Sequence, residues 1–334
     1  MKPVWSDVQT AQKFLQQYFK PTRLLCASSL GRGVGAPVYL KLESEMPTGS
    51  FKVRGALYAL HAEIERQPVT EVVASSTGNH GAAVAYAGKL TNLPVRIFLP
   101  RNANQTKEDR IRQLGGLIVE QGKDINEAFE NAREYASRTG AFLLNDATNR
   151  DVPVGTATIA VEIVEQLPDV TAIWVPMGDT ALIRGIASAA KHLRPKVRIV
   201  GVQAQRAPAY YLSWKQGVAV STDICDTIAD GLATRTPVPE NVVAIRELVD
   251  DSRLVTEAQM LHAIAHLLVK EHIVAEPAGA AATAAWMADP NSDAQGPTVL
   301  LVTGSNIAEK ILRQDLTQEN TISKNDETVP LYRP

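Results

Sequence analysis

The feature that most constrains the fold is an alternation of short β-branched runs with longer helical patterns, which begins near residue 70. The β-branched runs of this first set lie at 72–74, 95–99, 117–119 and 142–144. The helical patterns between them run through residue 90, over 106–114 and over 125–138. Because each helix carries the chain back to the same edge of a sheet, this order predicts a small parallel sheet with helical crossovers.

The same alternation resumes after residue 150. Further strands are expected at 172–175, 197–202 and 299–302, with an earlier one at 38–42. Helical patterns cover 156–166, a segment ending near 193, 256–271 and 277–287. The stretch between the strand at 197–202 and the helix at 256–271 reads as irregular, with Asp250 and Asp251 in turns. The sequence therefore predicts two α/β sets.

Composition excludes several classes of partner. The 334 residues are 45% hydrophobic, which is enough for two lobes, and the net charge of −2 gives no basic surface for nucleic acid or an anionic membrane. No apolar run has membrane-spanning length and no leader-like segment opens the chain, so we expect a cytoplasmic protein. Cys26 and Cys225 fit no metal or redox spacing and are expected to be buried thiols in a reducing compartment.

Lys52 lies in the run Pro-Thr-Gly-Ser-Phe-Lys-Val-Arg-Gly at residues 47–55. It stands between an apolar, glycine-containing segment and a predicted helix start. An amine held at such a place can lose solvent and its proton and become a nucleophile toward an aldehyde. Taken alone, the run also fits a lysine on a solvated helix face.

A second run, Val-Ala-Ser-Ser-Thr-Gly-Asn-His-Gly at residues 73–81, ends a β-branched strand in hydroxyls, a glycine and an amide. An alanine-rich helical pattern follows. Helix N-termini offer free backbone N–H groups and the positive end of a dipole, so this turn is suited to an anion. A plain helix cap is the alternative interpretation.

Together these runs resemble the fold-type II pyridoxal-phosphate enzymes, in particular the group of serine/threonine dehydratases (threonine ammonia-lyases), serine racemases and threonine synthases. Residues 50–56 resemble the cofactor-lysine motif and residues 76–80 the substrate-carboxylate loop. Residues 276–280 (EPAGA) and 303–306 (TGSN) match two later motifs in the right order. The resemblance extends from about residue 20 to about residue 315.

The resemblance implies an α/β fold of two lobes, each a mainly parallel sheet flanked by helices. A large cofactor-binding lobe would comprise residues 1–62 and 147–334, and a small lobe of residues 63–146 would be inserted in it. Residues 316–334 would form a surface tail.

The resemblance also implies the cofactor, pyridoxal 5′-phosphate, and the residues that bind it. Lys52 would be the covalent tether and the base at the substrate Cα, and Thr77 is the second catalytic candidate because racemases place a serine acid/base there. Phe51 would pack near the ring and Asn79 would bind the phenolic oxygen. Ser76, Thr77 and His80 would bind the substrate carboxylate. The expected phosphate loop is Gly178, Asp179, Thr180, Ala181 and Leu182.

Thr303 occupies the position where the family places a serine or threonine against the ring nitrogen. A hydroxyl donates to a neutral pyridine but does not stabilise a pyridinium as a carboxylate would. The ring is then a weaker electron sink, which suits β-elimination better than transamination. Without the other motifs, Thr303 would read simply as the end of a β-strand.

The chain departs from the dehydratase pattern in three places. The phosphate loop keeps one of four consecutive glycines, and we expect Asp179 to point away from the phosphate and cap the following helix. Gln203, Ala207 and Ala209 replace acids that bind a divalent cation in some relatives, so no metal site is expected. Thr77 replaces the serine that racemases use as a second acid/base, and its methyl group crowds the site; Ala128 stands where serine racemases carry an arginine, and both weigh against racemisation.

The sequence therefore predicts a lyase that dehydrates and deaminates a β-hydroxy-α-amino acid such as L-threonine or L-serine. An amino-acid racemase and a threonine-synthase-like β/γ-replacement enzyme are the alternatives within the cofactor class. A degenerate, cofactor-free binding protein is the alternative outside it. The expected partner is a small amino-acid substrate, without nucleic acid or membrane, and the expected assembly is a homodimer.

Overall fold

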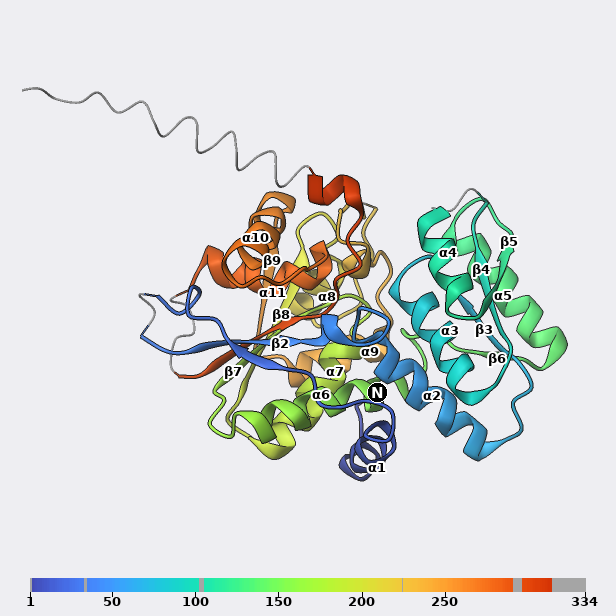
Figure 1. The fold of residues 1–334 in the computed structure, drawn as a ribbon, viewed down its shortest axis with the longest axis horizontal. Helices are drawn as coiled ribbons and strands as arrows, with labels where there is room; N and C mark the ends of the chain where they lie inside the picture. The colour runs from blue at the N-terminus through green and yellow to red at the C-terminus, as the bar shows by residue number, and fades with distance from the viewer. Residues whose placement is uncertain (1, 33–34, 102–104, 224, 291–295, 314–334) are drawn as a thin grey trace, which may run out of the picture.

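The chain forms two β-sheets, which lie side by side in Figure 1. The computed structural model describes residues 2–32, 35–101, 105–223, 225–290 and 296–313. The predicted tail at 316–334 lies outside the described residues.

The larger sheet contains six strands, and all neighbouring pairs are parallel except β1 with β2. Because β2 pairs with β10, residues from the beginning and the end of the chain lie in one sheet. In spatial order the strands are β1 (Leu24–Cys26), β2 (Val38–Leu42), β10 (Thr298–Val302), β7 (Ala172–Pro176), β8 (Arg198–Ala204) and β9 (Asp251–Val255).

Helices cover both faces of this sheet, because its central strands are apolar on both sides. Ile173 and Val175 of β7 belong to one core and Trp174 to the other. Trp174 meets Trp286 edge to face, with ring centroids 5.5 Å apart. The first core contains residues of α1 (Trp5–Leu15), α2 (Lys52–Arg66), α6 (Val152–Gln166) and α7 (Ala181–Leu193), and the second contains residues of α10 (Glu257–Lys270) and α11 (Pro277–Ala288).

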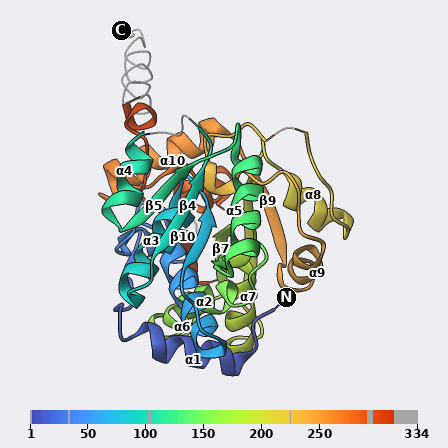
Figure 2. The same ribbon diagram turned by 90° about the vertical axis from the view of Figure 1, so that its right-hand side faces the viewer.

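The smaller sheet is wholly parallel, with the order β5-β4-β3-β6. Helices α3 and α4 lie on one side of it and α5 on the other, as Figure 2 shows. Helix α2 packs against both α3 and α6 and so connects the two sheets. The bounds are β3 (Val72–Ser75), β4 (Val95–Leu99), β5 (Gly116–Glu120), β6 (Phe142–Leu143), α3 (Asn79–Thr91), α4 (Gln105–Gln113) and α5 (Ile125–Thr139).

The predicted α/β fold, with mainly parallel sheets flanked by helices, is confirmed. The lobe boundaries at 62/63 and 146/147 stay an interpretation, and α2 runs across the first of them. The irregular stretch predicted between β8 and α10 is wrong, and so is the turn predicted at Asp251, which begins β9. This region contains α8 (Ala209–Gln216), the 3₁₀ turn η2 (Asp230–Leu232), α9 (Pro239–Leu248) and β9.

The missed strand lacks the signal on which the prediction depended. It reads Asp-Ser-Arg-Leu-Val and lies at the edge of the sheet, where polar residues replace an apolar run. The expectation of two buried thiols is also wrong, since Cys26 is exposed and Cys225 half-buried. Among the residues that the structure describes, no helix combines the length and apolar character needed to cross a bilayer.

Candidate active site

The candidate site lies where strands of both sheets end. Ser76 follows β3, Gly178 follows β7 and Thr303 follows β10, while Asp146 comes three residues after β6. The carboxyl ends of parallel strands share one edge of a sheet, and open α/β sheets bind ligands at that edge. The hydrogen bonds described below join these segments into one site.

The start of α2 is fastened to the end of β10. Ser50 forms an isolated bridge with Gly304, and the Phe51 amide donates to the Thr303 carbonyl at 3.1 Å. A Cβ on Gly304 would lie 2.3 Å from a carboxylate oxygen of Glu276, so a larger residue here would displace the Glu276 side chain. Lys52, the first residue of α2, is thereby held at the edge of the large sheet.

A buried charge cluster holds α2 from the other side. Arg54 donates to Glu43 at 2.8 Å and to Glu162 at 2.6 Å, and Lys41 donates to Glu162 at 2.6 Å. The cluster joins β2, the turn η1 (Glu43–Glu45), α2 and α6. Because removing one partner of a buried ion pair is costly, the cluster sets the position of α2 and of Lys52, two residues before Arg54.

Lys52 forms an ion pair with Asp146, and the two side chains are 17% and 13% exposed. Its Nζ also lies 5.5 Å from the centre of the Phe51 ring. Burial acts to lower the pKa of the Lys52 amine, but the charges of Asp146 and Asp179 outweigh burial and leave that pKa raised. Lys52 is therefore held as an ammonium in this state of the protein.

Asp146 also faces His80. Its Oδ2 lies 3.7 Å from His80 Nδ1, and His80 Nε2 bonds the Leu144 carbonyl at 2.9 Å. Burial acts to raise the pKa of Asp146, but His80 and Lys52 outweigh it and hold that pKa well below the ordinary value. The predicted tether and the predicted carboxylate loop thus meet at a carboxylate that the sequence analysis did not select.

The predicted carboxylate loop, residues 76–80, connects β3 to α3. The Gly78 amide donates to Ser76 Oγ at 3.2 Å, and both Ser76 and Thr77 are half-buried. Among the described residues, no side chain caps the start of α3, so its first backbone N–H groups can bind an anion. That Ser76, Thr77 and His80 bind a substrate carboxylate stays a prediction.

Asn79, the predicted partner of the phenolic oxygen, links three segments. Its amide donates to Glu276 at 2.6 Å and accepts from Asn306 at 2.5 Å. Arg110 of α4 donates to Asn306 and, at 2.7 Å, to the Thr48 carbonyl. This network joins α3 and α4 of the small sheet to the segments around α2 and β10.

The predicted phosphate loop lies between β7 and α7. A Cβ on Gly178 would come within 2.2 Å of the Gly231 carbonyl, so the remaining glycine is required by packing. Thr180 adopts a left-handed conformation, with φ of 69°, and is the N-cap residue of α7. Ala181 and Leu182 form the first turn of the helix, and no side chain caps them. Their N–H groups are placed to bind an anion.

The prediction that Asp179 caps α7 is wrong. Its Oδ1 accepts a hydrogen bond from Thr234 Oγ1 at 3.1 Å. Burial and the neighbouring Asp146 raise the pKa of Asp179. The Asp179 carboxyl group is thus directed toward Thr234 on another segment and not toward the N–H groups of α7.

Thr303 is 3% exposed, and its hydroxyl donates to the Ala278 carbonyl at 3.5 Å. A contact of this length is a weak hydrogen bond. The hydroxyl therefore retains the capacity to donate to a better acceptor, such as a pyridine nitrogen.

Gln203, Ala207 and Ala209, which replace the metal-binding acids of some relatives, are buried. Gln203 Oε1 accepts from the Tyr211 amide at 2.8 Å, and Ala207 and Ala209 are fully buried. Within the described part of the chain, no group of three or more His, Cys, Asp and Glu side chains is arranged to hold a metal ion. That activity needs no metal stays a prediction.

Sequence reasoning missed several residues of the site, foremost Asp146. A usable signal existed, since an acid soon after a strand of a parallel sheet lies at the ligand-binding edge. Asn306 and Glu276 stand inside motifs that were recognised, but no function was given to their side chains. Arg110 and Thr234 carry no comparable signal, because they reach the site only through tertiary structure.

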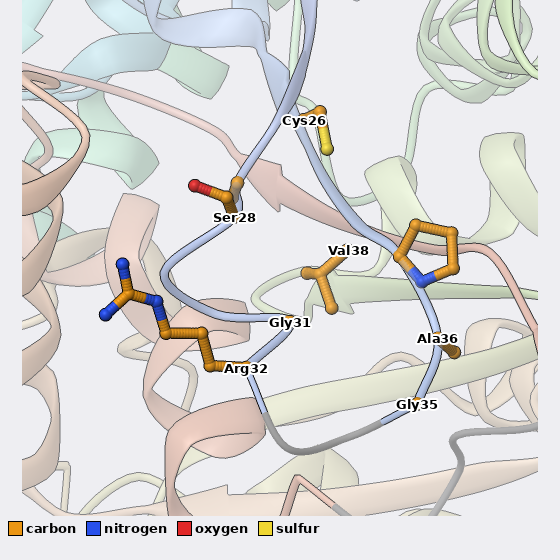
Figure 3. Close-up of a pocket in the computed structure, with 9 residues that line it drawn as sticks. Cys26, Ser28, Gly31, Arg32, Gly35, Ala36 and Val38 are labelled. Carbon is orange, nitrogen blue, oxygen red and sulfur yellow. The ribbon is translucent and has the colours of Figure 1, made fainter.

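A cavity of about 350 Å³ lies elsewhere, around the connection from β1 to β2 (Figure 3). Cys26, Arg32 and Val38 line it. Val38 is the first residue of β2, at the amino end of the strand, whereas the candidate site lies at carboxyl ends. This cavity is therefore separate from the candidate site.

The residues fit the cofactor that the resemblance implies. A partly exposed lysine at a fixed helix start can bind the aldehyde, and the cradle at Gly178 with the start of α7 can take the phosphate. The Thr303 hydroxyl can meet the ring nitrogen. When bound, the group supplies an electron sink for chemistry at the substrate Cα.

Comparison with known proteins agrees with this fit. The family of pyridoxal-phosphate dependent enzymes matches residues 15–304. An L-threonine ammonia-lyase of Thermotoga maritima is 35% identical over 302 residues, which are 90% of this chain and 75% of that protein. Maize serine racemase superposes with a TM-score of 0.87 at 29% identity, covering 96% of this chain and 98% of the other.

Threonine deaminase isoform 2 of Solanum lycopersicum superposes equally well, with a TM-score of 0.87 at 28% identity over 94% of this chain and 91% of the other. The family match includes Lys52, the loop at 76–80, the loop at 178–182 and Thr303, and these segments lie where strands of the two sheets end. The chain therefore belongs to the pyridoxal-phosphate dependent enzymes of fold type II.

Proposed function

We propose that the protein is an ammonia-lyase that converts a β-hydroxy-α-amino acid, such as L-threonine or L-serine, to a 2-oxo acid and ammonia. The proposal depends on two features of the site: Lys52 is held at the start of α2, and the Thr303 hydroxyl, which makes only a weak bond to Ala278, stands where the resemblance puts the partner of the ring nitrogen. A lysine base and a weak electron sink favour loss of a β-substituent over longer-lived carbanion chemistry. The similarity to L-threonine ammonia-lyase and threonine deaminase supports it.

The side chains have separable roles in this reaction. The start of α3, with Ser76 and Thr77, holds the substrate carboxylate and orients the Cα–H toward Lys52. The neutral Lys52 amine removes that proton and the C–O bond at Cβ breaks. The departing hydroxide takes up one proton, which balances the proton lost from Cα, and leaves as water. The enamine that is released tautomerises and is hydrolysed to the oxo acid and ammonia.

Racemisation is the second candidate, favoured by the structural similarity to maize serine racemase. It requires an acid/base on the face of the substrate opposite Lys52, and Thr77 is the residue available for that role. Ala128, at the position expected for a racemase arginine, is fully buried in α5. The alanine in place of that arginine supports elimination as the main activity. Membership of the family argues against a cofactor-free binding protein.

A substrate panel tests the proposed function. Purified holoenzyme is incubated with L-threonine, L-serine, a β-phenyl-substituted serine and O-phosphohomoserine, and oxo acid, ammonia and the opposite enantiomer are measured. We expect equal amounts of oxo acid and ammonia from at least one β-hydroxy amino acid. Formation of the enantiomer without ammonia would identify a racemase, and turnover of O-phosphohomoserine alone would identify a replacement enzyme.

Thr303→Ala is expected to lower cofactor affinity by about tenfold, because a buried acceptor that loses its hydrogen bond costs about 1–2 kcal/mol. Titration of the apoenzyme with cofactor measures this loss, with Thr303→Ser as the matched control that keeps the hydroxyl. If the alanine variant binds the cofactor as tightly as the wild type, the Thr303 hydroxyl does not contribute to cofactor binding.

A cytoplasmic location and a homodimeric assembly stay predictions. None of the described helices is long and apolar enough to span a membrane. Sedimentation of the holoenzyme would determine the assembly.

A further inference from the structure

The phosphate loop keeps a backbone conformation typical of glycine at a residue that is not glycine. Thr180 has φ of 69°, in the left-handed region. A non-glycine residue in that region is strained, and such residues concentrate at functional sites. The loop therefore keeps at Thr180 a backbone conformation that glycine usually adopts. The threonine adds a hydroxyl at the place where an anion is expected.

Arg184 holds that hydroxyl. It lies one helical turn after Thr180 on α7, and its Nε donates to Thr180 Oγ1 at 3.1 Å. Its Nη2 reaches the Ala147 carbonyl at 3.5 Å, and the residue is 2% exposed. A threonine hydroxyl has one proton and two lone pairs. Because Arg184 occupies a lone pair, the hydroxyl proton is left to donate to another acceptor.

A cation beside the loop would offset the negative charges of Asp179 and of the expected phosphate. Dehydratases of the family wrap the phosphate with the backbone of four glycines, whereas this loop carries the Asp179 carboxylate. That carboxylate and a dianionic phosphate repel each other. Burial lowers the pKa of Arg184 to about 10, so it remains a cation at neutral pH. A buried cation is stabilised when an anion binds nearby.

We propose that Arg184 and Thr180 form a donor pair for the cofactor phosphate, in which Arg184 supplies the charge and orients the Thr180 hydroxyl toward a phosphate oxygen. The pair replaces the function of the missing glycines. This inference rests on the cofactor of the family and not on the proposed elimination, since it concerns binding in the absence of substrate.

The test compares two aldehydes that differ only in the phosphate. Apoenzyme is titrated with pyridoxal 5′-phosphate and with pyridoxal, and bound aldehyde is followed by absorbance and by the mass of the borohydride-reduced protein. Arg184→Gln should weaken pyridoxal 5′-phosphate at least tenfold and leave pyridoxal within twofold. Thr180→Val should also weaken the binding of pyridoxal 5′-phosphate and not that of pyridoxal. Arg184→Lys should retain part of the preference for the phosphorylated aldehyde.

Asn241→Ala is the matched control. Asn241 donates to the same Ala147 carbonyl at 2.9 Å, and the other described hydrogen bond of its side chain goes to Tyr210 and not to Thr180. It should change the affinities for both aldehydes by the same factor. Equal losses for both aldehydes in Arg184→Gln and Thr180→Val, or no loss for either, would overturn the proposal and leave Arg184 a structural residue.

If Arg184→Gln does not fold, Thr180→Val and Arg184→Lys decide the question. Thermal unfolding of each apoenzyme identifies such a failure. The ³¹P resonance of the bound cofactor gives a second measurement, because loss of a charged neighbour should move it toward the free cofactor. An unchanged resonance together with unchanged selectivity in both variants would also overturn the proposal.

Discussion

Lys52→Ala is expected to reduce turnover by about 10⁴-fold or more, because one substitution removes both the covalent tether and the general base. The structure supports this expectation through the position of Lys52 at the fixed start of α2, beside Asp146 and over the Phe51 ring. Turnover is measured as ammonia release from the best substrate of the panel. Alanine is a good helix former, but it leaves Asp146 without its cation, so thermal unfolding must show that the variant is folded under the assay conditions.

Borohydride reduction of the wild-type holoenzyme, followed by mass spectrometry, should place the pyridoxyl group on Lys52. Lys52→Arg is the matched control, because it keeps the positive charge beside Asp146 but cannot form the covalent link. It should be as inactive as the alanine variant. A pyridoxyl group on another lysine, or substantial turnover by either variant, would refute the assignment.

Asp146→Asn is expected to shift cofactor capture by the apoenzyme to lower pH. The Lys52 amine must be neutral to attack the aldehyde. In the wild type, the Asp146 charge outweighs burial and raises the pKa of Lys52. Without that charge, the pKa of Lys52 falls relative to the wild type, so a larger fraction of the amine is neutral at pH 7. A fall of one pKa unit would make capture about tenfold faster at that pH.

Stopped-flow absorbance of the apoenzyme mixed with cofactor measures this rate from pH 6 to pH 9. Asp179→Asn is the matched control, since Asp179 also raises the pKa of Lys52 but forms its hydrogen bond with Thr234. It should shift the profile in the same direction by less. A profile that is unchanged in Asp146→Asn, or shifted to higher pH, would contradict the electrostatic role of Asp146.

The same pair predicts how stability depends on pH. The pKa of Asp146 in the folded protein lies below its ordinary value, so its pairing stabilises the apoenzyme above the ordinary carboxyl pKa. That contribution is lost as pH falls through the folded-state pKa. The difference in stability between wild type and Asp146→Asn should therefore be full near neutral pH and shrink in acid, as urea denaturation would show.

Much of the fold was readable because its signals are local. Strand and helix alternation depends on the period of apolar residues within short windows, and the predicted β2, β4 and α11 lie within about a residue of the observed elements. Where the local signal was weak, prediction was wrong. The polar edge strand β9 and the short helix α8 were read as irregular.

The residues of the site also fall into those that the sequence predicted and those that it did not. Lys52, Asn79 and Thr303 were predicted from motifs, because the chemistry of each resides in a few consecutive residues. The partners of these side chains were not. Asp146, Glu276 and Asn306 meet them across segments far apart in the chain.

The sequence by itself indicated the alternation of strands and helices outside the region between β8 and α10, the lysine predicted to be the tether and the loop that departs from the glycine-rich pattern. The tertiary structure alone decided that Asp146 pairs with Lys52, that Asp179 bonds Thr234 and that Arg184 holds Thr180. The reason is physical. Backbone propensity acts over a few residues, whereas an ion pair or a hydrogen bond forms only after packing has brought the ends of separate strands to one edge.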